Sequence, residues 1–234
     1  MVAAGPVSSP AEFAAAVAAH PFDLDLDAGE LAAAARVVAD DGLLVVGETH
    51  GVRETATALY ALAVASGARA LAFEWSHEEM DDLLQSFLGS GTFDFERLWA
   101  LPATAELFCG DGRITAGHFA LLGRLRAEGR LQQAIAFDRL DPEPLPDDWR
   151  VRERDLAARL LEQWDRRLPL LVLTGAFHAR PDAPQGDTMT ALLRRELPRV
   201  FSLMLDYAGM SPLPAAPLRL RVPVASPAVV PGKR

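Results

Sequence analysis

The most regular pattern along the chain is a series of short apolar runs, separated by segments whose apolar residues follow helical spacing. The runs lie at residues 43–46, 70–73, 133–137, 170–173 and 200–205. Continuous apolar composition is typical of strands that are buried on both faces of a parallel sheet. The pattern therefore predicts a series of buried parallel strands with helices between them.

Helix starts are indicated by capping sequences, in which a Ser or Asp cap stands three residues before a glutamate. Three segments fit this pattern: Ser9-Pro10-Ala11-Glu12, Asp27-Ala28-Gly29-Glu30 and Ser76-His77-Glu78-Glu79. Further helices are predicted over residues 54–66, 118–128, 151–166 and 188–196. Strands that alternate with helices predict an α/β fold with a mainly parallel β-sheet flanked by helices on both faces.

Three stretches interrupt the alternation of strands and helices: residues 89–117, residues 141–146 and the C-terminal residues 211–234. Residues 89–117 carry glycine-rich turns and are long for a connection between a strand and a helix, which predicts an insertion that serves as a lid or pocket wall. The proline-rich stretch Asp141–Pro146 is predicted to be a loop. The chain is therefore expected to hold one α/β domain over residues 1–210, followed by an extended, proline-rich C-terminal tail over 211–234.

Length and composition narrow the class of protein. The 234 residues suit one large domain, the net charge is −9, and no run of Lys or Arg opposes that charge, which argues against a nucleic-acid partner. No apolar stretch approaches the roughly 20 residues that span a bilayer, and no targeting segment is recognised. With a single cysteine, Cys109, no internal disulfide can form. These features predict a cytoplasmic protein without a membrane partner.

Candidate chemistry collects at the ends of the predicted strands. Ligands of open α/β sheets bind outside the carboxyl ends of the strands, so the residues that follow each strand are the candidates for a site. They are, in strand order, Glu48 with His50, Glu74, Asp138, His178 and Asp206. One acidic residue in a loop means little, but two histidines and several carboxylates at one edge predict a functional site.

Two kinds of chemistry suit this set. A histidine whose ring is oriented by a carboxylate is a general base near neutral pH. Equally, Glu48, His50, Glu74 and His178 could ligate a divalent metal such as zinc, manganese or cobalt, which would activate a water molecule. No phosphate-binding glycine motif follows the first strand, which weighs against nucleotide binding.

Structural roles are the alternative for each residue. Glu48 and His50 could simply belong to a loop that caps the next helix, although the flanking Gly47 and Gly51 favour a tight functional turn. His178 could be a hydrogen-bonded structural histidine after a buried strand. His118, at the start of a helix beside the insertion, is a further candidate for the site.

The motifs together resemble a known group of proteins. Gly47-Glu48-Thr49-His50-Gly51 is similar to the signature of the erythromycin esterase-like proteins and of the related haem-binding ChaN-like and Tiki-type metalloprotease group. Phe73-Glu74 with the helix 82–89, Arg154-Asp155-Leu156-Ala157, and Thr174-Gly175-Ala176-Phe177-His178 resemble further motifs of that group, in the same order along the chain. The Arg-Asp segment has a shorter spacing than the family pattern and lacks its methionine.

The resemblance implies roles for the matching residues. His50 would be the general base or a metal ligand, Glu48 and Glu74 its carboxylate partners, and His178 the second imidazole. Arg154 would supply positive charge to an oxyanion or hold a carboxylate, with Asp155 beside it on the same helix.

The function expected on this basis is a hydrolase that cleaves an ester or amide bond, in a small-molecule or peptide substrate. A haem-binding or other ligand-binding protein of ChaN type is the alternative. A third possibility is a peptidase, lyase or cyclisation step in natural-product biosynthesis, which would use the same base chemistry.

Overall fold

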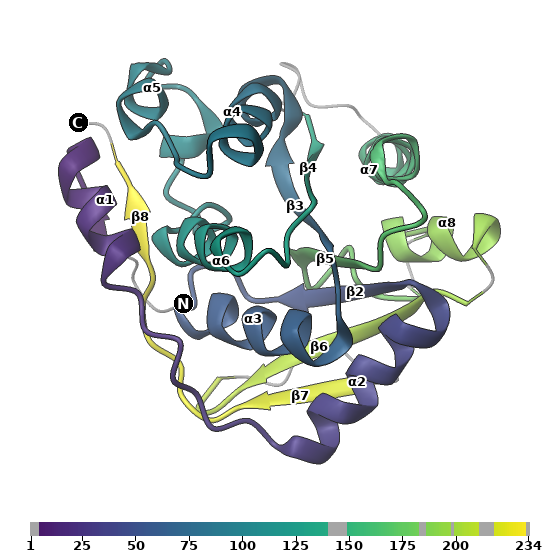
Figure 1. Cartoon of the computed structure of the whole chain (residues 1–234). Coiled ribbons are helices and arrows are strands. Elements are labelled where there is room, and N and C mark those ends of the chain that lie inside the picture. The colour runs from purple at the N-terminus through teal and green to yellow at the C-terminus, as the bar shows by residue number, and fades with distance from the viewer. Residues whose placement is uncertain (1–4, 140–148, 183–185, 198, 211–217, 233–234) are drawn as a thin grey trace.

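A six-stranded parallel sheet forms the centre of the computed structural model, which describes residues 5–139, 149–182, 186–197, 199–210 and 218–232. The strand order is β4-β3-β5-β2-β6-β7, and every neighbouring pair is parallel (Figure 1). The strands are β2 (Leu43–Glu48), β3 (Ala70–Ser76), β4 (Gln133–Asp138), β5 (Leu170–Gly175), β6 (Phe201–Tyr207) and β7 (Leu218–Val222). The predicted α/β fold is confirmed.

Helices cover both faces of this sheet because successive strand residues point to opposite sides. Leu44 and Val46 join one buried apolar cluster, whereas Leu43 and Val45 join the other. The first cluster lies under α2 (Ala28–Asp41), α3 (Glu54–Ser66), α4 (His77–Ser90) and α6 (Ala116–Ala127). The second lies under α7 (Arg150–Gln163) and α8 (Met189–Glu196), on the other side of the sheet in Figure 1.

The first cluster is extended by the N-terminal helix and by the predicted insertion. Helix α1 (Pro10–Ala18) packs on α6 and on α5 (Phe95–Ala100), and a short 3₁₀ helix, η1 (Glu106–Phe108), follows α5. Phe13 is fully buried, with its ring 5.7 Å from the ring of Phe95 and 5.4 Å from that of Phe119. The segment after residue 89 is thus anchored on the core by aromatic side chains.

Two of the three predicted capping sequences act as expected. The side chains of Ser9 and Asp27 accept hydrogen bonds from the backbone N–H groups of Glu12 and Glu30. Ser76 is different, because its side chain makes no capping bond to α4 and its hydroxyl instead donates to Glu78. The backbone N–H of Ser76 donates to the carboxylate of Glu106 at 2.6 Å, which ties the end of β3 to the insertion.

The expected boundary at residue 210 is wrong. Leu218–Val222 forms β7, which pairs with β6 as the sixth strand of the sheet, and β8 (Val229–Pro231) pairs with β1 (Gly5–Val7) in a separate two-stranded sheet. Alternating Leu218, Leu220 and Val222 supply the apolar face of β7, so the high proline content of the C-terminal segment does not prevent strand formation there. The predicted loop Asp141–Pro146 lies outside the described residues.

No helix within the described ranges is both long enough and apolar enough to cross a bilayer.

Candidate functional site

The turn after β2 places a carboxylate and an imidazole side by side. Oε1 of Glu48 lies 3.0 Å from Nδ1 of His50. Glu48 is buried, with 3% of its surface exposed, whereas the His50 side chain is 27% exposed. A buried carboxylate therefore orients an imidazole whose edge reaches solvent, which is the arrangement of an oriented general base.

A close backbone approach fixes this turn against the insertion. Gly51 and Gly112 both have positive φ, and the backbone N–H of Gly51 donates to the carbonyl of Gly112 at 3.2 Å. A Cβ added to Gly112 would lie 2.4 Å from both the Cα and the N of Gly51, so only glycine fits there.

The C-terminal segment braces the same turn from the other side. Val52 forms an antiparallel bridge with Pro227, and the N–H of Ala228 donates to the carbonyl of Gly51 at 2.9 Å. The N–H of Ser226 donates to the carboxylate of Glu54 at 2.8 Å, at the start of α3. The segment predicted to be a tail therefore supports the loop that carries His50.

Glu74 lies at an irregularity in β3. The pairing of β3 with β4 shifts register between Phe73 and Ser76, as at the β-bulges that often re-aim side chains near functional sites. One carboxylate oxygen of Glu74, Oε2, accepts hydrogen bonds from the hydroxyl of Thr174 at 2.6 Å and from the N–H of Gly175 at 2.8 Å. Its other oxygen, Oε1, is left to face the cationic groups of the site.

His178 follows β5 and lies between two carboxylates. Its Nδ1 is 2.5 Å from Oε1 of Glu153 on α7, and its Nε2 is 3.4 Å from Oε1 of Glu74. Glu153 is itself buried, and its second oxygen accepts the N–H of Met189 at the start of α8. Both ring nitrogens of His178 thus have an acidic partner.

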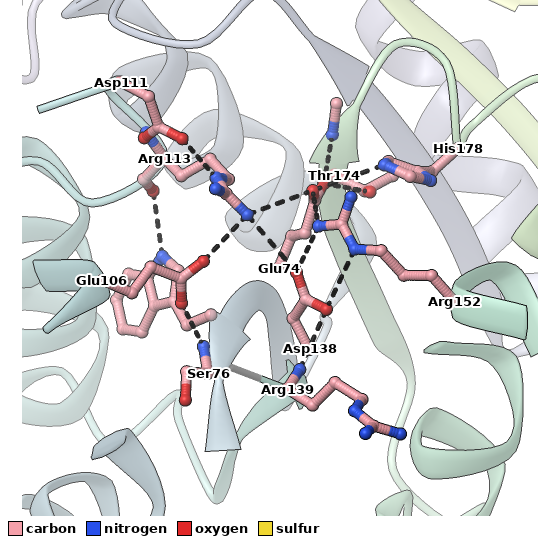
Figure 2. A network of polar contacts seen from close by, with 12 residues as sticks. Glu74, Ser76, Glu106, Asp111, Arg113, Asp138, Arg139, Arg152, Thr174 and His178 are labelled. Atoms are coloured by element: carbon pink, nitrogen blue, oxygen red, sulfur yellow. Dashed lines mark hydrogen bonds and ion pairs between the residues drawn. The ribbon is translucent and has the colours of Figure 1, made fainter. Parts of the chain in front are cut away.

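Two arginines complete the network in Figure 2. Arg152 of α7 lies 3.1 Å from Oε1 of Glu74 and 2.5 Å from Oδ2 of Asp138. Arg113, from the insertion, lies 2.8 Å from Glu106 and 3.4 Å from Asp138. Three separate parts of the chain, namely β3, the insertion and α7, therefore meet at the ends of β4 and β5.

Gly175 connects the two halves of the site. A Cβ added there would lie 3.0 Å from Nε2 of His50 and 3.6 Å from Oε2 of Glu74. The missing side chain at this position allows the imidazole of His50 and the carboxylate of Glu74 to approach the same point at the end of β5.

The charges of His178 and Glu74 are mutually stabilised. Burial alone would lower the pKa of His178, but the charge of Glu74 and the hydrogen bond with Glu153 outweigh it and raise the pKa from 6.5 to about 9. Burial alone would raise the pKa of Glu74, but the positive charges of His178, His50 and Arg152 keep it well below its ordinary value. At neutral pH, His178 is therefore a cation and Glu74 an anion.

The Glu48–His50 pair holds its proton more tightly than a free imidazole. Burial opposes the charge of His50, yet the hydrogen bond and negative charge of Glu48 raise the pKa of His50. Burial also raises the pKa of Glu48, against the opposing effect of His50. In the insertion, burial is the main reason that the pKa of Glu106 rises to about 7, even though Arg113 lies beside it.

The structure brings together most of the residues expected at the site: Glu48, His50, Glu74, Asp138 and His178. His118 lies behind them, only 1% exposed, with its ring 5.6 Å from that of Phe73. Burial, together with the charges of His50 and His20, lowers the pKa of His118 to about 3, so it stays neutral.

Arg154 and Asp155 do not join the cluster, in contrast to the expectation from the Arg-Asp motif. Arg154 is exposed and lines a surface pocket between α7 and α8, and Asp155 makes a surface ion pair with Arg139 at 2.8 Å. The reason is helical geometry, because each residue turns the side chain by about 100°. Arg152 and Glu153 occupy the turn of α7 that faces the sheet.

The spacing of α7 contains a signal for Glu153. Its buried apolar positions are Leu156, Ala157 and Leu160, and Glu153 precedes them by three, four and seven residues, which places it on the same face. Arg113 has no comparable signal, because it lies in a segment without periodic pattern.

The side chains present do not fit a divalent metal site. No group of three or more His, Cys, Asp or Glu side chains in the described ranges is arranged to hold one. Both nitrogens of His178 face carboxylates, and Oε2 of Glu74 already accepts two hydrogen bonds. The guanidinium of Arg152 lies 3.1 Å from the other oxygen of Glu74, Oε1, and its positive charge would repel a metal ion bound there. With both nitrogens engaged, His178 also offers no ligand to haem iron.

Comparisons with known proteins find similarity in structure only. The sequence matches no protein-family model and no curated protein. The effector domain RRSP of a MARTX toxin from Vibrio vulnificus has a similar structure, with a TM-score of 0.53 and 16% identity over 87% of this chain and 40% of that chain. A structure described as bacterial protein toxins gives a TM-score of 0.52 and 16% identity, over 84% of this chain and 39% of that one.

A Bacillus cereus protein is also similar, with a TM-score of 0.51 and 11% identity over 86% of this chain and 76% of that chain. This chain thus spans about two fifths of the length of the two toxin structures. At these identities the similarity shows a shared fold.

Proposed function

We propose that this protein is a hydrolase of the erythromycin esterase-like and ChaN-like type, which cleaves an ester or amide bond in a small-molecule or peptide substrate. The observation that carries the proposal is the pairing of Nδ1 of His50 with the buried carboxylate of Glu48 at 3.0 Å, next to the cationic cluster of Arg152 and His178. An oriented base beside fixed positive charge is what hydrolysis of a carbonyl compound requires.

His50 acts as the base. When Nδ1–H donates to Glu48, the lone pair of Nε2 is free to take a proton from a water molecule. The water oxygen then attacks the carbonyl carbon, and the carbonyl oxygen takes the negative charge of the tetrahedral intermediate. The carbonyl double bond then re-forms as the bond from the carbonyl carbon to the alcohol oxygen or amine nitrogen breaks, and the proton held by His50 passes to that leaving atom. Water is consumed, and an acid and an alcohol or amine are released.

Arg152 stabilises the negative charge that develops on the carbonyl oxygen. Its side chain is 29% exposed and is held by Asp138 and Glu74, so its position is fixed before the substrate arrives. His178 stays protonated at neutral pH and therefore contributes charge and orientation to Glu74 without acting as a base. Fixed cations of this kind need little reorganisation during the reaction.

The sequence resemblance supports the reaction class, since the matching residues Glu48, His50, Glu74 and His178 belong to one cluster. The resemblance does not extend to a particular substrate. The divalent metal considered from the sequence has no place in this mechanism, because the donor set described above does not fit it.

The test compares the wild-type protein with His50→Ala and Glu74→Gln on two generic probes, p-nitrophenyl acetate for esters and fluorescently labelled casein for peptides. His50→Ala is expected to lose at least about 100-fold in rate, the usual range for loss of a general base. Glu74→Gln removes the charge that holds Arg152 and His178 in place and is expected to lose about as much. Glutamine is chosen at Glu74 because it keeps the shape of a buried side chain. Circular dichroism checks that each variant is folded.

His77→Ala is the matched control, since His77 is a partly exposed histidine at the start of α4 whose only described ion pair is with the neighbouring Glu78. It is expected to keep wild-type rates. Equal rates in wild type and folded His50→Ala on both probes would contradict the proposed function.

A further inference from the structure

A large aromatic side chain lies exposed next to the candidate site. Phe177 is 37% exposed, and among the described residues only Phe177 and Val224 are large apolar side chains with this much exposure. Its ring centre is 5.5 Å from the ring of His178, and the two rings are nearly perpendicular. Ligand sites are commonly lined by aromatic side chains together with a few polar groups, and an exposed ring beside a polar cluster has this composition.

Trp149 extends this aromatic surface. Its ring lies 5.2 Å from that of Phe177, in an edge-to-face arrangement. Trp149 precedes α7, and its backbone carbonyl accepts the N–H of Glu153, the residue that binds His178. The two rings are therefore joined to the same helix turn and the same loop that carry the charged groups of the site.

We infer that Phe177 and Trp149 form an apolar subsite, which binds an aromatic or large aliphatic group of the substrate beside the bond to be cleaved. This inference rests on the proposed hydrolase function. The neighbouring site groups, Arg152, His178 and Glu74, are charged and suit the reacting carbonyl, so the adjacent rings are the surface that would select the apolar part. The substrate class is accordingly an ester or amide that carries a bulky apolar side chain.

A purely structural role for Phe177 is the competing explanation. In that case the ring only supports the orientation of His178, and its removal would lower the rate for every substrate by a similar factor. A subsite makes a different prediction, because the loss depends on the size of the substrate's side chain. The two explanations are separated by measuring binding and selectivity.

Binding is measured first, without any need for catalysis. Saturation-transfer NMR follows N-acetyl-L-phenylalaninamide and, as a small reference, N-acetylglycinamide, with wild type, Phe177→Ala, Trp149→Ala, and Val224→Ala as the matched exposed control. The phenyl ring is expected to receive saturation from wild type and from Val224→Ala, with the signal at least threefold weaker in Phe177→Ala and in Trp149→Ala. The glycine compound is expected to receive little in all of them.

His50→Ala is included because it separates binding at the subsite from catalysis by the base. The subsite can then be tested even if the proposed hydrolase function is wrong. That variant is expected to bind the phenylalanine compound as wild type does, whether or not the protein is a hydrolase. Equal phenyl signals in wild type and folded Phe177→Ala would overturn the subsite.

Selectivity is measured next, as the ratio of kcat/KM for the p-nitrophenyl esters of N-acetyl-phenylalanine and N-acetyl-glycine. Phe177→Ala is expected to reduce this ratio roughly three- to tenfold, mainly through KM, as the loss of one aromatic contact would. An unchanged ratio with an equal fall in both rates would show that Phe177 acts only by supporting His178.

Discussion

Glu153 and His178 form a buried ion pair at the site, with Oε1 of Glu153 2.5 Å from Nδ1 of His178. The side chain of Glu153 is 2% exposed and that of His178 is 11% exposed. The pair connects α7 to the loop after β5, and the second oxygen of Glu153 adds α8 through the N–H of Met189. A single buried carboxylate therefore connects α7, α8 and the loop after β5. The two helices lie on the face of the sheet opposite to α3 and α6.

Replacement of this carboxylate should be costly. Glu153→Gln removes one of the two counter-charges of a buried imidazolium, the one that lies nearest to it, so we expect a loss of about 3 kcal/mol in the free energy of unfolding. Asp155→Asn, two residues along the same helix, removes only a surface ion pair and should cost less than about 1 kcal/mol. Urea unfolding at pH 7 gives both values. Equal losses of unfolding free energy in the two variants would show that the buried Glu153–His178 contact stabilises the protein no more than a surface ion pair does.

The raised pKa of His178 should make stability depend on pH. The pKa is about 9 in the folded protein against 6.5 for a free histidine, so the unfolded chain loses this proton first. The contribution is fully present below pH 6.5 and is lost as the pH rises through 9, by up to about 3 kcal/mol. Urea unfolding between pH 6 and pH 10 measures it.

His178→Gln supplies the reference for this titration, because glutamine cannot be protonated. The difference in unfolding free energy between wild type and His178→Gln is expected to be large at pH 6 and to shrink toward pH 10. A difference that stays constant over this range would mean that His178 carries no stabilising charge in the folded protein.

The candidate site could be predicted largely because of the parallel sheet. Carboxyl ends of parallel strands meet at one edge, so Glu48, Glu74 and His178 were brought together by strand positions alone. The pattern of the strands was unambiguous because they are buried on both faces. Strand positions do not predict which partner each side chain contacts across the site.

The register of α7 differs from the one that the Arg-Asp motif predicts, for a physical reason. The Arg-Asp motif predicts Arg154 and Asp155 at the site, whereas the face of α7 that meets the sheet is set by its apolar residues. Buried Leu156 and Leu160 place Glu153 on that face, and a buried glutamate requires a partner such as His178. Helical spacing would thus have given Glu153 in place of Asp155.

Arg113 and strand β7 show two further limits. Arg113 reaches Asp138 and Glu106 from an irregular segment, where no periodic pattern indicates which side chain points inward. For β7 the signal was present, since Leu218, Leu220 and Val222 alternate with arginines as in a half-buried strand. The prolines around this segment obscured the pattern.

Two of the arginines of α7, Arg152 and Arg154, allow a direct test of the register. Arg152→Ala removes the cation that lies 3.1 Å from Glu74, and we expect kcat to fall about 100-fold, as for loss of one group that stabilises an oxyanion. Arg154→Ala alters an exposed residue of the same helix and should leave kcat within about twofold. Both variants are assayed on the p-nitrophenyl ester that the wild-type protein cleaves fastest, chosen from p-nitrophenyl acetate and the p-nitrophenyl esters of N-acetyl-phenylalanine and N-acetyl-glycine. A greater loss in Arg154→Ala would restore the motif-based assignment.

Metal removal should leave activity intact. The nitrogens of His178 and the oxygens of Glu74 are engaged by protein groups, and the charge of Arg152 opposes a second cation. We expect protein purified without chelator to contain less than about one tenth of an equivalent of zinc, manganese or cobalt, and its rate to be unchanged by EDTA. Activity that is lost in EDTA and restored by one of these metals would contradict the mechanism.

The close approach of Gly112 to Gly51 should make the His50 turn sensitive to one methyl group. Gly112→Ala places a Cβ 2.4 Å from the backbone of Gly51 and forces alanine to a φ of +90°, so the turn must shift. Gly110→Ala is the matched control, since its φ is +72° but no atom lies within 4 Å of the added Cβ.

The control variant should therefore show only the backbone cost of a left-handed residue, about 1–2 kcal/mol, and keep wild-type kcat. Gly112→Ala should lose a further 1 kcal/mol or more, roughly, and should also lower kcat, because displacement of Gly51 moves His50 away from the point that it shares with Glu74 at Gly175. Urea unfolding and ester hydrolysis are measured on both variants. Equal stability and equal rates would show that this contact does not position the base.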